Sequence, residues 1–130
     1  MAQWEIEIIL SRHLAENLAM PMFIVDPDGN LIFYNEPAEA ILGLRYNETG
    51  TMPAQEWATI FYPVDHKGLP IKPEELPLMI AKNERHPAHK RFWIRGLDDA
   101  LRHIEVTAFP LIGQAGHFLG AIAIFWEVPE

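Results

Sequence analysis

Apolar and polar positions at the start of the chain alternate at helical spacing. Between Trp4 and about Ala19 the apolar residues lie three or four positions apart, with charged and polar residues between them, which is typical of an amphipathic helix. These residues are Ile6, Ile9, Leu10, Leu14 and Leu18. Trp4 and Ile8 widen the apolar surface, so we expect the helix to contact more than one neighbour. Pro21 ends it, because proline disfavours helical backbone in the residue before it.

Two short β-prone runs follow, Met22 to Val25 and Leu31 to Tyr34, joined by the sequence DPDGN. Proline presets the φ angle of a turn, and Asp-Gly supplies the left-handed position that closes a hairpin. Asn35 then precedes a short apolar repeat, where its side chain can accept hydrogen bonds from the first free N–H groups of a helix. Gly43 is a natural terminator of that helix.

The middle of the chain has weaker patterns. Residues Trp57 to Phe61 favour a brief helical segment, and Gly68 to Glu75 is rich in turn residues. Pro77 to Lys82 reads as another short helix, with a proline near its start.

The last third of the chain predicts three strands. Residues Lys90 to Arg95 and Leu101 to Leu111 alternate between apolar and polar, while Phe118 to Val128 is apolar on both faces. In the last strand one face carries Leu119, Ala121, Ala123 and Phe125, and the other carries Phe118, Ile122, Ile124 and Trp126. A strand that is apolar on both sides is central in its sheet, so we expect the early hairpin to pair with it. The N-terminal helix, or its copy from a second subunit, is the candidate to cover one face.

These elements predict one α+β domain: a five-stranded antiparallel sheet with short helices across one face and an N-terminal amphipathic helix. We assign residues 1–20 to a capping or dimerisation helix and residues 21–128 to the domain itself. The length of 130 residues leaves no room for a second domain.

Composition and charge exclude several classes of protein. Hydrophobic residues make up 49% and charged residues 22%, with mean hydropathy −0.01, as in ordinary globular domains. The formal net charge of −8 argues against nucleic acid as a partner. The basic residues Lys90, Arg91 and Arg95 alternate with apolar ones and fit the solvated side of a strand. No apolar run is long enough to span a bilayer, so we expect no membrane partner and a cytoplasmic location.

Candidate catalytic and metal-binding residues all have structural explanations. The chain has no cysteine, which excludes thiolate nucleophiles and cysteine-ligated metal sites. Ser11 and His13 are two apart on a helix and do not face each other, while the pairs Asp98-Asp99 and Glu74-Glu75 suit a turn and a helix start. We therefore expect no catalytic residues, no metal site and no enzyme activity.

Taken together and in order, the sequences FIVDPDGNLIFYNEPAEAILG, GLPIKPEELPLMIAKN, IEVTAFPLIG and GHFLGAIAIFWEV resemble PAS sensory domains. This resemblance implies the strand order 2-1-5-4-3, a cavity between short helices and the sheet, and a role in sensing or protein interaction. It also implies that Asp26, Gly29 and Asn35 are structural anchors, in agreement with the turn and the cap.

The expected faces of these elements also indicate which residues could surround such a cavity. They are Ile41, Trp57, Ile60, Met79, Ile80, Phe92, Ile94, Ile104, Val106 and Ala121. Apolar residues are equally consistent with a core filled to normal density, so the sequence leaves open whether the cavity is hollow. A small apolar or weakly polar molecule is the ligand that such walls favour.

The sequence does not identify a bound cofactor. Some PAS domains carry haem on a histidine of the last helix, but Pro77 to Asn83 contains none, and His86, His89 and His103 are expected on the surface. The cysteinyl flavin adduct of light-sensing members needs a cysteine that is absent here. Noncovalent flavin stays open as an alternative, and so does haem.

The leading hypothesis is a noncatalytic sensory or regulatory module. It would bind a small molecule or a protein partner and pass the signal through its N-terminal helix or its C-terminal exit to an effector. The alternative is a redox or gas sensor that carries haem or flavin. A two-sided apolar strand beside an amphipathic helix favours a homodimer, with an interface drawn from Ile6, Ile9, Leu10, Leu14, Ile122, Ile124 and Trp126.

Overall fold

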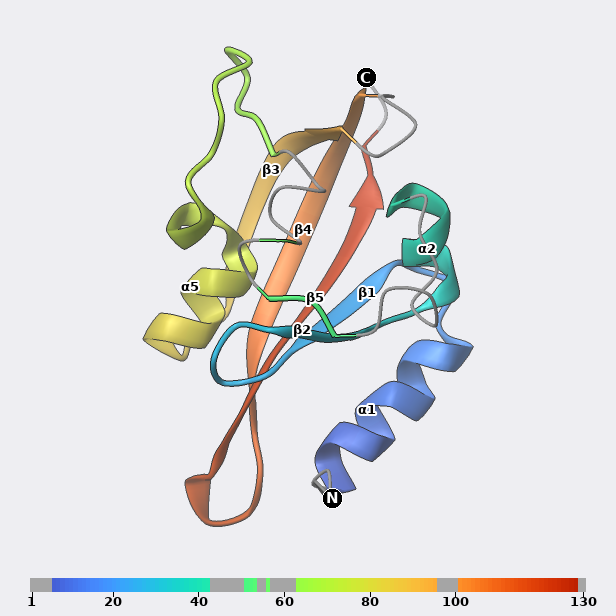
Figure 1. Cartoon of the computed structure of the whole chain (residues 1–130), viewed down its shortest axis with the longest axis vertical. Helices are drawn as coiled ribbons and strands as arrows, with labels where there is room; N and C mark the ends of the chain where they lie inside the picture. The colour runs from blue at the N-terminus through green and yellow to red at the C-terminus, as the bar shows by residue number, and fades with distance from the viewer. Residues whose placement is uncertain (1–5, 43–50, 54–55, 57–62, 96–100, 129–130) are drawn as a thin grey trace.

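The computed structural model describes residues 6–42, 51–53, 56, 63–95 and 101–128 (Figure 1). It contains one five-stranded antiparallel sheet with the strand order β2-β1-β5-β4-β3. The strands are β1 (Met22–Val25), β2 (Leu31–Tyr34), β3 (Ala88–Arg95), β4 (Leu101–Ile112) and β5 (Phe118–Glu127). The helices are α1 (Ile6–Asn17), α2 (Glu36–Leu42) and α5 (Pro77–Glu84), with short 3-10 helices at Pro73–Glu75 and Gln114–Gly116. The α+β fold and the expected strand order are confirmed.

Strand β5 lies at the centre of the sheet, between β1 and β4, and both of its faces are covered. We call the face toward α2 and α5 the inner face and the face toward α1 the outer face. Because side chains alternate along a strand, β1 and β5 contribute to two separate cores. Phe23 and Ala123 belong to the inner core, and Ile24 and Ile122 belong to the outer core.

The β1–β2 turn is held by the carboxylate of Asp26. Its Oδ1 accepts hydrogen bonds from the backbone N–H groups of Asp28 and Asn30, each at 2.9 Å. Its Oδ2 accepts one from the side-chain amide of Asn30 at 3.1 Å. Gly29 takes the left-handed backbone conformation, with φ of +90°. The turn chemistry therefore follows the expectation from the sequence.

Leu119 lies on the opposite face from the one expected. The register between β4 and β5 shifts so that Leu111 pairs with Gly120 and Ile112 pairs with Phe118, which leaves Leu119 unpaired. Leu119 therefore packs in the outer core, away from Ala121 and Phe125. Gly120 makes this irregularity feasible, because its φ is +135° and a Cβ there would lie 2.0 Å from the Val25 carbonyl oxygen.

Helix α1 packs on the outer face through Ile8 and Ala15, the two residues that it buries. They join Met22, Ile24, Ile32, Phe33, Leu119 and Ile122 in the outer core. The more regular apolar stripe of the helix points away from the sheet, with Ile6, Ile9, Leu10 and Leu14 between 42% and 61% exposed. The helix thus has one apolar face for its own sheet and a second one on the surface.

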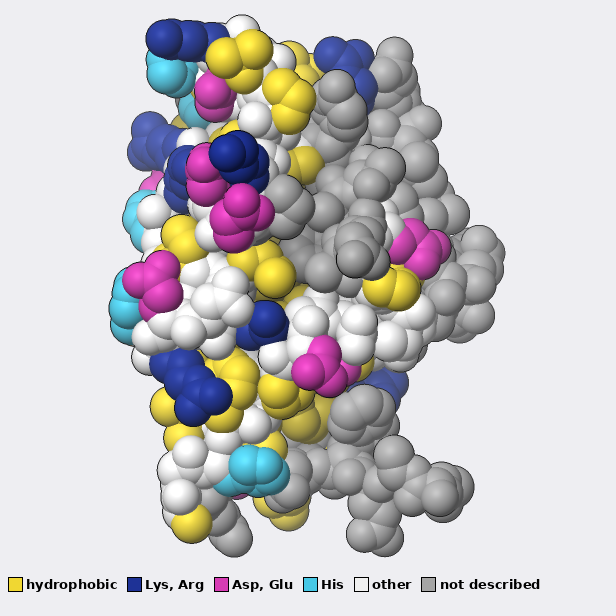
Figure 2. Space-filling view, turned by 60° about the vertical axis from the view of Figure 1, so that its left-hand side comes forward, with side chains coloured by type: hydrophobic (Ala, Val, Ile, Leu, Met, Phe, Trp, Pro, Cys, Tyr) yellow, Lys and Arg dark blue, Asp and Glu magenta, His cyan; other side chains and the backbone are white. Residues whose placement is uncertain are grey.

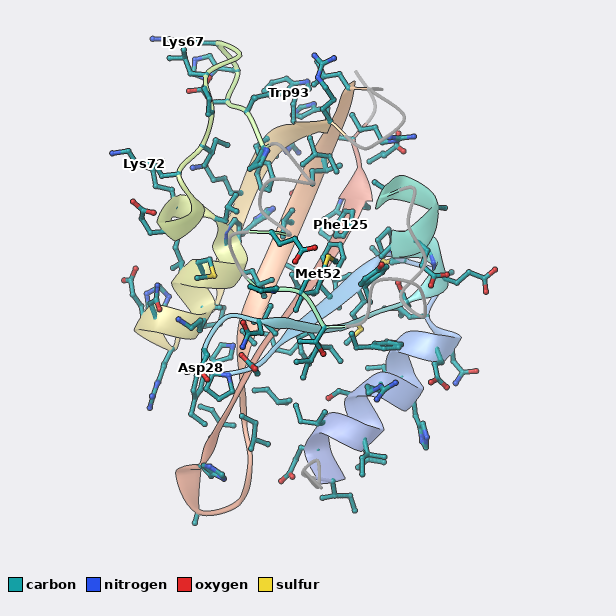
Figure 3. All side chains as sticks on the ribbon, in the orientation of Figure 1. Asp28, Met52, Lys67, Lys72, Trp93 and Phe125 are labelled. Carbon is teal, nitrogen blue, oxygen red and sulfur yellow. The ribbon has the colours of Figure 1, made fainter. Side chains whose placement is uncertain are left out.

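Each edge strand of the sheet pairs with one residue from the segment between α2 and α5. Met52 exchanges two backbone hydrogen bonds with Leu31 on β2, at 2.7 and 3.0 Å. Val64 exchanges two with Trp93 on β3, at 2.8 and 3.0 Å. Because β2 and β3 are opposite edges, Met52 and the Val64–Trp93 pair lie on opposite sides of the sheet, as the labelled Met52 and Trp93 in Figure 3 show.

Three expectations lie outside the described residues: the helical segment Trp57 to Phe61, the turn in the sequence GLDDA, and the terminator Gly43. Among the residues that are described, no helix has the length and hydropathy needed to cross a membrane.

Candidate functional site

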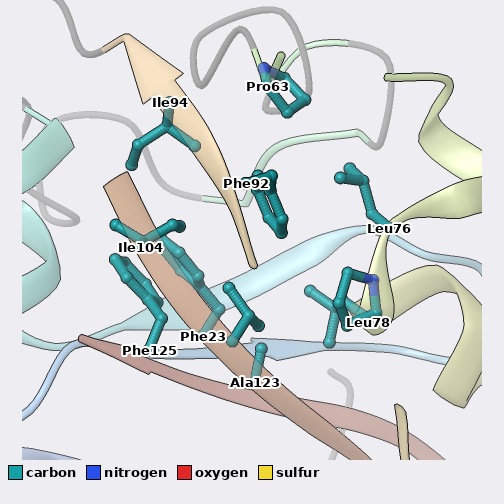
Figure 4. A pocket seen from close by; sticks show the side chains of 11 residues that line it. Phe23, Pro63, Leu76, Leu78, Phe92, Ile94, Ile104, Ala123 and Phe125 are labelled. Atoms are coloured by element: carbon teal, nitrogen blue, oxygen red, sulfur yellow. The ribbon is translucent and has the colours of Figure 1, made fainter. Parts of the chain in front are cut away.

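A small cavity of about 50 Å³ lies between the inner face of the sheet and the segment that leads into α5 (Figure 4). Strands β1, β3, β4 and β5 contribute to it, together with the start of α5. The described residues that line it are Phe23, Pro63, Leu76, Pro77, Leu78, Phe92, Ile94, Ile104, Val106, Ala123 and Phe125. All of them are apolar, so none of these side chains offers a charge or a strong hydrogen bond to a ligand.

The strand register explains why there is space at this point. Ala123 lies opposite Phe23 on one side and Ala108 on the other. Two alanines side by side leave room above the sheet that larger side chains would fill. The aromatic rings form one wall, since Phe23 and Phe125 stack with their centroids 5.1 Å apart.

The start of α5 forms the opposite wall. Leu76 has extended backbone, with φ of −75° and ψ of 142°, and Pro77 begins the helix, where its missing N–H is not required. Pro77, Leu78 and Ala81 are the residues that the helix buries. Arg85 caps the end of the helix: its backbone is left-handed, and its N–H donates to the Ala81 carbonyl at 3.0 Å.

Four of the candidate pocket residues line this cavity: Phe92, Ile94, Ile104 and Val106. Ala121 is fully buried in the inner core without lining the cavity, and Ile41 and Met79 pack against that core while partly exposed. Ile80 is half-buried on α5. Trp57 and Ile60 lie outside the described residues.

Sequence reasoning missed the contributions of β1, of the C-terminal part of β5 and of the residues before α5. The signal for the strands was available, because Ala123 and Phe125 share a face with Ala121, and Phe23 shares one with Val25. Helix α5 was harder, since its eight residues include apolar side chains on every side. Burial of Leu78 in place of Met79 and Ile80 depends on how the helix is rotated against β4.

The side-chain amide of Asn35 joins three elements and is 2% exposed. Its Oδ1 accepts hydrogen bonds from the backbone N–H of Met22 at 3.0 Å and of Ala38 at 3.2 Å. Its Nδ2 donates to the carbonyls of Ala15 and Met20, both at 2.9 Å. One residue therefore links the end of α1, the start of β1 and the first turn of α2.

The candidate dimer residues fall into two groups. The four on α1 are exposed, and Ile124 and Trp126 are half-buried on β5. Ile122 is only 3% exposed because it lies in the outer core with Ile8 of the same chain. It has no surface to offer a partner while α1 is docked.

Histidines on and before β3 contact carboxylates at the surface. The Nε2 atom of His89 lies 2.6 Å from Oε2 of Glu105, and Nε of Arg91 donates to Oε1 of Glu105 at 3.0 Å. His103 stacks on Trp93 with centroids 4.1 Å apart. The described residues hold no group of three potential metal ligands among His, Cys, Asp and Glu.

Two exposed groups have shifted pKa values. The pKa of His86 is raised above 6.5 because its ring bonds the Pro87 carbonyl and, secondarily, the Glu84 carboxylate. The pKa of Asp65 is lowered from 3.8, chiefly by the hydrogen bond from the Leu69 N–H. Figure 2 shows basic, acidic and histidine side chains interspersed over the side that carries α5. Neither shifted group lines the cavity.

The described lining of the cavity does not fit haem or flavin. Haem iron takes an axial ligand such as His, Cys, Met or Tyr, and the described lining has none of these. Pockets for drug-sized ligands measure roughly 300–1,000 Å³, well above the size of this one. We therefore assign no role to either cofactor in this cavity.

Comparisons with known proteins agree with this geometry. A family model described as PAS domain matches residues 10–77, and no curated protein matches the chain. The PAS domain of BvgS from Bordetella pertussis superposes with a TM-score of 0.73 at 16% identity, covering 97% of this chain and 89% of that one. A PAS domain from a two-component sensor histidine kinase gives 0.61 at 11% identity, with 95% and 97% covered.

A third solved structure is the LOV protein from Rhodobacter sphaeroides, with a TM-score of 0.71 at 11% identity, covering 97% of this chain and 70% of that one. At such identities the superpositions describe the fold alone, whereas the family model spans more than half of the sequence. Together with the strand order, the α5-roofed inner face and the Asn35 cap, the match shows that the chain belongs to the PAS domain family.

Proposed function

We propose that this chain is a noncatalytic regulatory module that senses a small molecule at its inner face and transmits the signal through α1 or through the exit after β5. Binding would bias how α5 and its neighbours pack on the sheet. Helix α1 or the C-terminal exit would carry that bias to an effector. The absence of catalysis is part of the proposal, since the described lining of the cavity carries no nucleophile and no acidic or basic side chain.

The observation that carries the proposal is the Asn35 network. A shift of β1 or α2 cannot leave α1 unaffected while one amide bonds all three. The strands add a second route, because neighbouring residues of β1 and β5 alternate between the inner and the outer core. Packed cores switch between discrete packing arrangements and do not deform continuously.

The exposed stripe of α1 supports a homodimer as the assembly that receives the signal. Ile6, Ile9, Leu10 and Leu14 form a continuous apolar surface of the kind that marks interaction sites. In a symmetric dimer the same stripe of both subunits forms the interface. The half-buried Ile124 and Trp126 would extend that interface along β5.

Sedimentation velocity of the wild type and of Leu10→Glu tests this proposal. A glutamate in the stripe places a charge in an apolar contact of each subunit, so we expect the dissociation constant to rise at least about 100-fold. The matched control is Leu69→Glu, because Leu69 is 57% exposed and Leu10 is 58% exposed. Leu69 lies far along the chain from α1.

Dimerisation of the wild type and of Leu69→Glu, with loss of the dimer in Leu10→Glu, is the expected result. A wild type that stays monomeric at high micromolar concentration would contradict the proposed assembly. Equal behaviour of the two variants would show that the interface lies elsewhere.

A further inference from the structure

We infer that the cavity takes an uncharged, apolar molecule of gas or short-hydrocarbon size, with no more than about four non-hydrogen atoms, and not a bound cofactor. This inference rests on the proposed function, because it names the ligand class of the same cavity. Three features carry it: the size of the cavity, the lack of polar side chains in its described walls, and the aromatic rings among them.

Size sets the scale of the part of a ligand that the described walls can surround. A single water occupies about 10–15 Å³, and an engineered apolar cavity of about 150 Å³ holds benzene or xenon. At about 50 Å³ the space is smaller than that cavity and larger than a single water. A molecule of two to about four non-hydrogen atoms occupies such a space.

The walls exclude polar ligands of the same size. A carboxylate, alcohol or amide entering the cavity would give up its hydrogen bonds to water, and the described lining has no polar side chain to replace them. A ligand without polar groups makes no hydrogen bonds to water, so it can contact the walls without this desolvation penalty.

The rings of Phe23, Phe92 and Phe125 favour a polarisable occupant. Phe23 and Phe125 already stack at 5.1 Å, so the occupant lies against their surface without separating them. Dispersion contacts are then the main attraction. At the ceiling known for very small ligands, four non-hydrogen atoms correspond to a dissociation constant of about 40 µM, so we expect values from there into the millimolar range.

Methyl NMR of the full chain, labelled at isoleucine and leucine methyl groups, tests the inference with xenon, cyclopropane and acetate as probes. We expect saturable shifts at Ile94, Ile104 and Leu78 with xenon, and also with cyclopropane if the site accepts hydrocarbons. Leu31, which is buried and does not line the cavity, serves as the internal reference. Acetate should leave all of these signals unchanged.

The matched variants are Ala123→Val and Ala121→Val. Both alanines lie on the inner face of β5, but only Ala123 lines the cavity. We expect Ala123→Val to lower the xenon-induced shift at Ile104 at least fivefold and Ala121→Val to preserve it. Val106→Ile also fills the cavity, because Val106 lines it, but it adds one carbon atom and not two. This variant replaces Ala123→Val if Ala123→Val does not fold.

Three results would overturn the inference. They are no saturable shift at the cavity methyls with either apolar probe, an acetate shift equal to that of xenon, and shifts at the same methyls with haemin or flavin mononucleotide whose visible absorbance stays with the protein after gel filtration. None of them alters the dimer measured by sedimentation. Conversely, a monomeric wild type with a normal xenon response would refute the proposed assembly and leave this ligand class standing.

Discussion

At the scale of single residues, Asn35 has the most consequential contacts. An amide can both donate and accept, and here both functions are used inside the protein, with two bonds accepted and two donated. A carboxylate could not donate, and a serine could not reach all four partners. The sequence indicated the cap to α2 but gave no sign of the two bonds back to the end of α1, because those partners lie 15 and 20 residues earlier.

Asn35→Ala should destabilise the protein by at least about 3 kcal/mol, because it leaves buried backbone groups without partners at about 1–3 kcal/mol each. Urea unfolding followed by circular dichroism measures the change. Asn30→Ala is the control, since it removes one side-chain bond in a partly exposed turn and should cost about 1 kcal/mol or less. Equal losses in the two variants would show that the Asn35 bonds contribute little.

At the scale of elements, local chemistry made the hairpin predictable and packing decided the rest. The bounds of β1 and β2 follow from a turn sequence with few alternative conformations. Leu119 shows the opposite case: strict alternation fails at Gly120, and a glycine inside a strand is the available signal of an irregularity. The rotation of α1 and of α5 had no local signal, because apolar residues occupy more than one face of each.

The two apolar faces of α1 should differ sharply in their contribution to stability. Ile8→Ala removes a buried side chain from the outer core, so we expect a loss of about 2–4 kcal/mol. Ile6→Ala alters an exposed position and should stay within about 0.5 kcal/mol. Both variants replace isoleucine by alanine in the same helix, so urea unfolding at low micromolar concentration compares a buried with an exposed position. The reverse order would mean that α1 docks through its exposed stripe.

At the scale of the whole molecule, charge opposes association while the α1 stripe favours it. Each chain carries a formal net charge of −8, so two copies repel one another over a distance that salt controls. Acidic residues such as Glu16 flank the stripe on α1 itself. The proposed dimer therefore combines apolar attraction with electrostatic repulsion.

Raising the ionic strength should strengthen the dimer. Between 20 and 300 mM sodium chloride we expect the dissociation constant to fall roughly threefold to tenfold, because the screening length shrinks below the size of the interface. Sedimentation equilibrium measures it, and Glu16→Gln should show a smaller dependence on salt. A dimer that weakens as salt is added would point to an interface between opposite charges.

The pairing of Val64 with Trp93 bears on how rigidly one wall of the cavity is held. Pro63, the residue before Val64, is part of the cavity wall, and Val64 is fastened to the sheet by two backbone bonds. Opening of both bonds would free the edge of β3 at this wall, and the Trp93 amide, which donates one of them, reports such opening through its solvent deuterium uptake. Slow deuterium uptake at Trp93 would therefore show that this wall of the cavity is held rigidly, and fast uptake would show that it opens often.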